Sequence, residues 1–147
     1  MPSRRRLREQ ALQVLFSWDA RKRPDAQEQF GIEEALSGYY DGIYSEDSDT
    51  PRARDEFVER LARTASARVE EIDKRISSHA EHWRLERMPA VDRNLLRLAI
   101  AEMITEGTPA PVVIDESLEL ARRFAGEDSV HFINAVLDAV RKELGAG

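Results

Sequence analysis

Apolar residues recur at helical spacing along most of this chain. In the first segment they share one face of a helix, at Leu7, Ala11, Val14, Leu15 and Trp18. Ser3 is suited to cap the start of this helix, and Pro24 marks its end. A second, weaker helix is expected from Asp25 to about Tyr44, where three glycines interrupt the pattern.

The next apolar stripe begins after a polar linker at residues 45–51. Thr50 followed by Pro51 predicts the start of a long helix, because a capping residue before a first-turn proline favours helix initiation. The stripe continues through Phe57, Leu61, Ala65, Val69, Ile72 and Ile76. A short piece with Trp83 and Leu85 follows, and Pro89 interrupts it.

Three further helices are predicted in the last third of the chain. The first ends before Gly107, the second opens at Pro109 and Pro111 and closes at Gly126, and the third runs to Leu144. Asp128 or Ser129 is expected to cap the last helix. Since no segment alternates with a period of two residues over a useful length, the pattern predicts an all-α protein of about seven helices.

Charge is distributed unevenly along these predicted helices. The net charge is −6, yet residues 1–23 carry seven basic and two acidic side chains. Residues 24–50 carry eight acidic side chains and no basic ones. The basic start therefore indicates a local site for a polyanion on an otherwise acidic protein.

Four arginines at the start of the first helix make up most of this positive charge: Arg4, Arg5, Arg6 and Arg8. Each exposed cation there opposes the helix dipole by about 0.3–1 kcal/mol, so an external anion would stabilise the arrangement. Arginine suits phosphate because its planar fork donates in pairs. Two interpretations remain open: a solvated tail, or an arm that binds a nucleic-acid backbone. A membrane surface is less favoured, because the core needs the apolar stripe that follows.

The chemistry of an enzyme is missing from the sequence. There is no cysteine, no glycine-rich phosphate loop, no HExxH motif and no nucleophile elbow. His79 and His82 share a spacing of three but lack an obvious third ligand, so no metal site is expected. No apolar run approaches the roughly 18 residues that span a bilayer. We expect a cytoplasmic protein that is not an enzyme and has no cofactor.

Three phenylalanines are candidates for stacking on RNA bases. Phe16 lies off the main stripe of the first helix, and Phe124 and Phe132 bracket the turn before the last helix, with Asp128 between them. Taken alone, each ring belongs more often to a core, and Asp128 is more often a helix cap than a base acceptor.

Three stretches together resemble the NusB family of transcription antitermination factors. RRRLREQALQVLFSWD at 4–19 resembles its arginine-rich opening, and ERMPAVDRNLLRLAIAEM at 86–103 resembles its central motif. PVVIDESLELARRFAGEDSVHFINAVLDAV at 111–140 resembles its C-terminal signature. The resemblance covers nearly the whole chain. It implies a single all-α RNA-binding domain of two three-helix subdomains, at about 1–80 and 81–147.

The resemblance also implies a function. NusB-like proteins bind boxA RNA, notably in ribosomal RNA leaders, together with the small-subunit ribosomal protein NusE. The complex joins RNA polymerase and other Nus factors so that transcription reads through terminators. Carried over residue by residue, the expected partner-binding positions are Glu86 and Asp92. The expected RNA-binding positions are Arg4, Arg5, Arg6, Arg8, Phe16, Phe124, Asp128, Ser129 and Phe132. Monomer and homodimer both remain open.

This chain departs from the family pattern at several points. Ala135 stands where glycine is usual, Phe124-Ala125-Gly126 replaces a shorter Phe-Gly step, no aromatic residue marks the region of His79, and the 24–50 segment is unusually acidic. Two alternatives stay open: a helical protein–protein adaptor, or a NusB-like domain serving ribosomal RNA processing or modification. Because no cofactor-binding α/β domain follows Gly147, we expect a standalone factor.

Overall fold

The computed structural model describes residues 3–21, 30–42, 53–80 and 84–145. Within these ranges the chain forms seven α-helices, one 3₁₀ turn and no strand, which confirms the all-α prediction. The elements are α1 (Arg4–Arg21), α2 (Ile32–Gly42), α3 (Glu56–Ala67), α4 (Val69–His79), η1 (Leu85–Arg87), α5 (Ala90–Thr105), α6 (Ala110–Phe124) and α7 (Glu127–Glu143). None of the described helices is long and apolar enough to cross a membrane.

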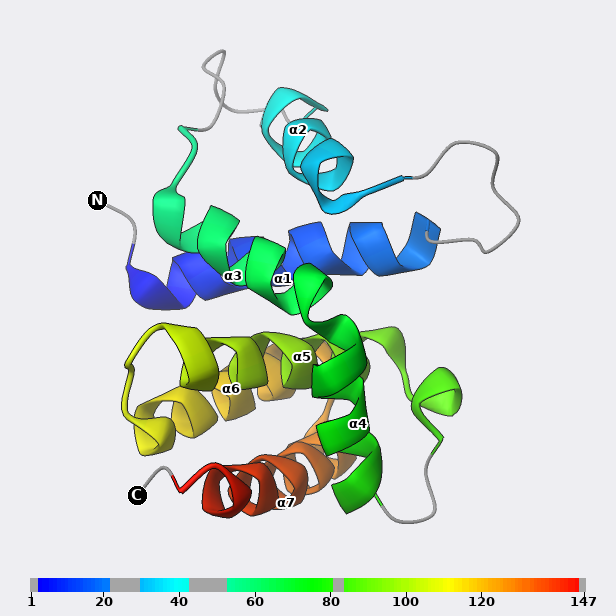
Figure 1. Cartoon of the computed structure of the whole chain (residues 1–147), viewed down its shortest axis with the longest axis vertical. Coiled ribbons are helices and arrows are strands. Elements are labelled where there is room, and N and C mark those ends of the chain that lie inside the picture. The colour runs from blue at the N-terminus through cyan, green and yellow to red at the C-terminus, as the bar shows by residue number, and fades with distance from the viewer. Residues whose placement is uncertain (1–2, 22–29, 43–52, 81–83, 146–147) are drawn as a thin grey trace.

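The helices form two groups, one above the other in Figure 1. The upper group is α1, α2 and α3, and the lower group is α4 to α7. Helix α5 packs against α1 and α3 of the upper group and against α4, α6 and α7 of its own. One buried hydrophobic core runs through both groups. The subdomain division near residue 80 stays a prediction, because the shared core does not test it.

Several predicted helix ends are confirmed. Ser3 lies directly before α1, and its hydroxyl accepts a hydrogen bond from the backbone N–H of Arg6 at 3.2 Å. Gly107 follows the end of α5 with φ +69°. Gly126 follows α6 with φ +105°, a backbone conformation that residues with a Cβ rarely adopt. These glycines therefore mark helix ends for the reason the sequence predicts.

The long helix predicted from Thr50 is wrong in two respects. It is divided into α3 and α4 at Arg68, whose ψ of 22° leaves the helical range. Helix α3 begins at Glu56, and Asp55 caps it by accepting a hydrogen bond from the N–H of Phe57 at 2.8 Å. Thr50 and Pro51 themselves lie outside the described residues.

Two other predicted helix starts differ from the structure. Helix α2 begins at Ile32, while the predicted start at Asp25 lies outside the described residues. Helix α7 begins at Glu127 with Gly126 as its N-cap. The prediction of a cap at Asp128 or Ser129 is therefore wrong, because the positive φ of Gly126 turns the chain into the helix before either residue. Both lie instead in the first turn of α7.

Candidate nucleic-acid interface

A polar pocket lies where the N-terminus of α1 meets the connection from α5 to α6. It has a volume of about 590 Å³, and we call it the arginine pocket. Its lining residues are Ser3, Arg4, Arg5, Arg8, Glu106, Thr108, Val112 and Glu116. The sequence thus correctly predicts a local concentration of positive charge, but the pocket also contains carboxylates from two other segments.

The three leading arginines are exposed and have different surroundings. The Arg4 guanidinium lies 4.0 Å from the centroid of the Phe57 ring on α3. Arg5 reaches α6, where its Nε and Nη2 donate to the two carboxylate oxygens of Glu116 at 2.8 and 3.2 Å. This pairing lowers the pKa of the Glu116 carboxyl. Arg6 is exposed and has no ion pair within the described ranges. All three can therefore meet an external anion.

Arg8 has a different environment from its neighbours. It is buried, and its Nε and Nη2 donate to Oε1 and Oε2 of Glu102 on α5 at 2.7 and 2.6 Å. The hydrogen bonds to Glu102 raise the pKa of the Arg8 guanidinium. The Arg8 guanidinium and the Glu102 carboxylate satisfy each other's hydrogen bonds inside the protein. The geometry therefore supports a structural role for Arg8 and not the phosphate contact implied by the resemblance.

An apolar groove of about 240 Å³ lies farther along α1. Its lining residues are Glu9, Leu12, Gln13, Phe16, Val91 and Phe124. Phe16 and Phe124 are 41% and 44% exposed, which is unusual for such large apolar side chains. Exposed aromatic rings on the same helix as a basic pocket suit single-stranded nucleic acids, which place phosphates on cations and stack bases on rings.

The cationic side chain of Arg123, on α6, lies beside the apolar groove. The Arg123 guanidinium is 5.0 Å from the Phe124 ring centroid and donates to the Glu9 carboxylate at 3.2 Å. Arg123 was not among the residues that the sequence pattern or the family resemblance indicated. The sequence did offer one signal for Arg123, namely its position next to Phe124 in the C-terminal motif.

The three predicted RNA-binding residues on α7 differ in how exposed they are. Asp128 is exposed in the first turn. Ser129 is partly buried, and its hydroxyl donates to Oδ1 of Asp92 on α5 at 3.0 Å. Phe132 is partly buried and packs against the hydrophobic core. Asp128 therefore faces solvent, while Ser129 and Phe132 connect α7 to the rest of the fold.

The two predicted partner-binding residues also differ. Glu86 is exposed on η1. Asp92 is only 4% exposed, and burial raises the pKa of its carboxyl. Because Ser129 donates a hydrogen bond to Asp92, this buried carboxylate joins the start of α5 to the first turn of α7.

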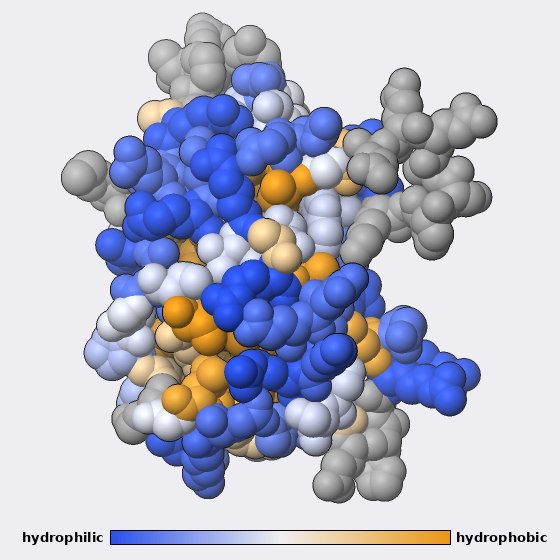
Figure 2. All heavy atoms as spheres, in the orientation of Figure 1, coloured by the Kyte–Doolittle hydropathy of each residue, from blue (hydrophilic) through white to orange (hydrophobic). Residues whose placement is uncertain are grey.

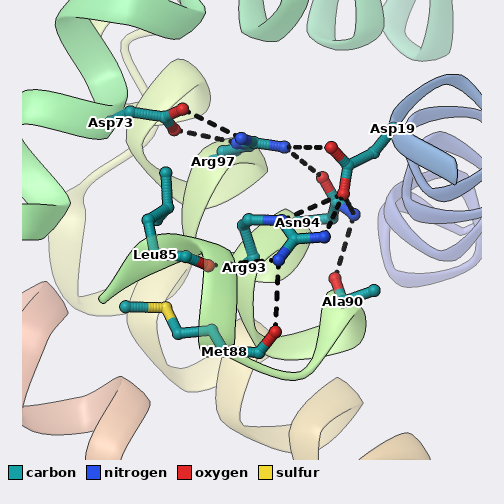
Figure 3. Close-up of polar contacts among 8 residues, drawn as sticks. All are labelled: Asp19, Asp73, Leu85, Met88, Ala90, Arg93, Asn94 and Arg97. Atoms are coloured by element: carbon teal, nitrogen blue, oxygen red, sulfur yellow. Dashed lines mark hydrogen bonds and ion pairs between the residues drawn. The ribbon is translucent and has the colours of Figure 1, made fainter. Parts of the chain in front are cut away.

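A polar network holds η1 in place, as Figure 3 shows. Arg93 on α5 donates to the backbone carbonyls of Leu85 and Met88 at 3.1 and 3.2 Å, and its Nε donates to Asp19 on α1 at 2.9 Å. Arg97 bridges Asp19, at 3.0 Å, and Asp73 on α4, at 2.8 Å. Each arginine thereby joins helices that are distant in sequence. The network was not predicted, because its pairs between helices join residues that are 24 to 78 positions apart in the sequence.

The described residues also bear on the histidine pair. His79 Nε2 lies 2.6 Å from Oε2 of Glu143, which lowers the pKa of the Glu143 carboxyl. Within the part of the chain that the structure describes, no group of three metal-ligating side chains occurs. His82 lies outside the described residues.

On the face in Figure 2, hydrophilic residues cover much of α3 and α4, and hydrophobic residues are visible between α5 and α7. At the start of α4, acidic and basic side chains form local ion pairs, for example Arg68 with Glu71 at 2.6 Å. The α4 surface also carries a pocket with three basic lining residues, Arg68, Lys74 and Arg75. The arginine pocket differs from it in lying on the same helix as the apolar groove.

Comparisons with known proteins agree with this fold. A family model described as the NusB family matches residues 5–142. The transcription antitermination protein NusB of Solibacter usitatus is 58% identical over 98% of this chain and 92% of its own length. The protein of the same name from Koribacter versatilis is 48% identical, with the same coverage of both chains.

Solved structures give the same result. A T. maritima NusB structure aligns with a TM-score of 0.77 and 34% identity, covering 97% of this chain and 92% of that one. A structure of the antitermination factors NusB and NusE in complex with dsRNA aligns with a TM-score of 0.76 and 27% identity, covering 95% and 96%. The chain therefore belongs to the NusB family, the family of these transcription antitermination proteins.

Proposed function

We propose that this protein is an RNA-binding transcription antitermination factor that recognises a boxA-type RNA together with the ribosomal protein NusE. The observation that best supports this proposal is that the arginine pocket and the apolar groove follow one another along one helix, α1. The similar structure that contains NusB, NusE and dsRNA supports the choice of RNA and NusE as partners.

The RNA would lie along α1 and the adjoining part of α6. Arg4, Arg5 and Arg6 would contact phosphates, which provides affinity without sequence preference. Phe16 and Phe124 would stack on unpaired bases about 17 Å farther along α1, as the helical rise of 1.5 Å per residue requires. Asp128 is exposed near the end of α6 and would accept a hydrogen bond from a base amino group.

NusE would bind on the side of η1 and the start of α5. Glu86 is exposed there, and an acidic protein attracts a basic ribosomal protein. Asp92 is buried and hydrogen-bonded to Ser129, so it would contribute by holding the start of α5 in position. RNA polymerase and other Nus factors would join through this assembly, in the cytoplasm, at ribosomal RNA operons.

The test is fluorescence anisotropy of a labelled boxA-like RNA against the full chain, with a scrambled RNA of equal length as control. Each RNA is titrated with and without NusE at several salt concentrations. Tighter binding to the boxA-like RNA, strengthened by NusE, is the expected result. Equal and weak binding to both RNAs, without any effect of NusE, would leave the family membership but reject the proposed recognition.

A further inference from the structure

Two arginines on the proposed RNA surface are paired with glutamates from the facing helix. Arg5 of α1 binds Glu116 of α6 through two hydrogen bonds, at 2.8 and 3.2 Å. Arg123 of α6 binds Glu9 of α1 at 3.2 Å. The two pairs are reciprocal, since each helix contributes one arginine and one glutamate.

The members of each pair are exposed to different degrees. The side chains of Arg5 and Arg123 are 54% and 53% exposed, whereas those of Glu116 and Glu9 are 22% and 18% exposed. The arginine side chains are thus the more exposed members of both pairs, and the carboxylates are the more covered ones. Each arginine has room to turn toward an incoming anion while its glutamate stays in place.

A carboxylate and a phosphate use the same donors of a guanidinium. Both accept paired N–H hydrogen bonds from the planar fork, so they compete for it. Arg5 already uses Nε and Nη2 on Glu116. A phosphate at this position has to displace the carboxylate or share the arginine with it, and it also approaches a fixed negative charge.

We propose that Glu9 and Glu116 are specificity-determining residues that compete with RNA phosphates for Arg123 and Arg5. The inference rests on the proposed RNA-binding function and adds a role for two acidic residues inside its basic surface. The competition lowers affinity for any RNA backbone. Stable binding then requires the base contacts at the apolar groove, which only a suitable sequence makes well.

Removal of either carboxylate should strengthen RNA binding. An exposed ion pair is weak, so Glu116→Gln and Glu9→Gln should each tighten binding by about twofold to fivefold. Because phosphate contacts carry no sequence information, the scrambled RNA should gain at least as much as the boxA-like RNA. Gln keeps the size and hydrogen-bonding capacity of Glu while removing its charge.

The matched control is Glu71→Gln on α4. Glu71 forms an equivalent two-point pair with Arg68, at 2.8 and 2.6 Å, but lies outside both pockets on α1. It changes the net charge by the same amount. Its effect on RNA affinity therefore measures the general electrostatic contribution alone.

The experiment is anisotropy with the labelled boxA-like and scrambled RNAs, on full-length variants whose thermal unfolding matches the wild type. Tighter binding by Glu116→Gln and Glu9→Gln, with little change for Glu71→Gln, supports the proposal. Unchanged or weaker binding by both variants, while the wild type binds RNA, overturns the proposal and leaves the proposed function intact. Absence of RNA binding by the wild type rejects the proposed function and the competition together.

Discussion

Arg8 of α1 and Glu102 of α5 form a buried ion pair with two hydrogen bonds, of 2.7 and 2.6 Å, across 94 positions of sequence. The pair joins the upper helix group to the lower one, since α1 belongs to the first and α5 to the second. The first two turns of α1 also carry the exposed side chains of Arg4, Arg5 and Arg6. One end of α1 thus combines an internal attachment with an external basic surface.

Breaking the buried pair at one partner should strongly destabilise the fold. Glu102→Gln leaves the Arg8 charge buried without its counter-ion, so the free energy of unfolding should fall by about 3 kcal/mol, as measured by urea denaturation. A double variant, Arg8→Leu with Glu102→Leu, removes both charges and should recover much of this loss. A single variant within 0.5 kcal/mol of the wild type would show that the pair is not buried in solution.

Asp19 should make stability depend on pH in the acidic range. Hydrogen bonds from Arg93 and Arg97 outweigh its burial and lower its pKa below the ordinary 3.8. Its contribution is therefore complete above that value and is lost as pH falls through the lowered pKa. Asp19→Asn should cost about 2 kcal/mol at pH 7 and flatten this acid-side loss. Urea denaturation at pH 7 and below 4 measures both effects, and an unchanged pH profile would contradict the assignment.

Asp92 should have the opposite pH dependence. Burial raises its pKa above 3.8, so the folded protein holds this proton to higher pH than the unfolded chain does. Its contribution to the free energy of unfolding therefore falls as pH rises from the unfolded value through the raised folded value. Asp92→Asn should remove this decline and be no less stable than the wild type at pH 7. A large loss of stability at pH 7 would show that the ionised carboxylate is required.

The exposed arginines at the start of α1 should determine the salt dependence of RNA binding. A variant with Arg4, Arg5 and Arg6 all changed to Ala should reduce the slope of log K against log salt by up to about 2, at roughly 0.7 for each single-strand phosphate contact. Arg68→Ala, on α4, is the control. Arg8 is left unchanged because its loss would disturb the fold. An unaltered slope would place the phosphate contacts elsewhere.

Phe16 and Phe124 should affect RNA binding and leave stability nearly unchanged. Both rings are exposed, so Phe16→Ala and Phe124→Ala should change the free energy of unfolding by no more than about 0.5 kcal/mol. Each should weaken RNA binding by about 1–3 kcal/mol if its ring stacks on a base. Leu at the same position keeps apolar area without a ring, so wild-type affinity in Phe124→Leu would exclude stacking.

The sequence was sufficient to predict what depends on local pattern. The apolar stripes identified α1, α5, α6 and α7, and Gly107 and Gly126 marked helix ends through their backbone conformation. The stripe could not reveal the break at Arg68, because Ala65, Val69 and Ile72 keep helical spacing across it. The pattern reports which face is buried, not whether the helix axis continues.

The candidate site was only partly predictable for a similar reason. Phe16 and Phe124 were selected by resemblance, and the structure gives both an exposed place in one groove. The burial of Arg8 depends on Glu102, and the pairing of Arg5 depends on Glu116, each on a distant helix. Charge counted along the sequence does not show which cations are already neutralised within the fold.

The most direct measurement is amide NMR mapping of the full chain during titration with the boxA-like RNA. The largest shift changes should follow the exposed residues of α1 and the end of α6, including Arg5, Phe16, Arg123 and Phe124. The α4 surface around Arg68 and Glu71 should change little. Changes confined to α4 and the end of α7, with α1 unaffected, would contradict the assignment of the RNA surface.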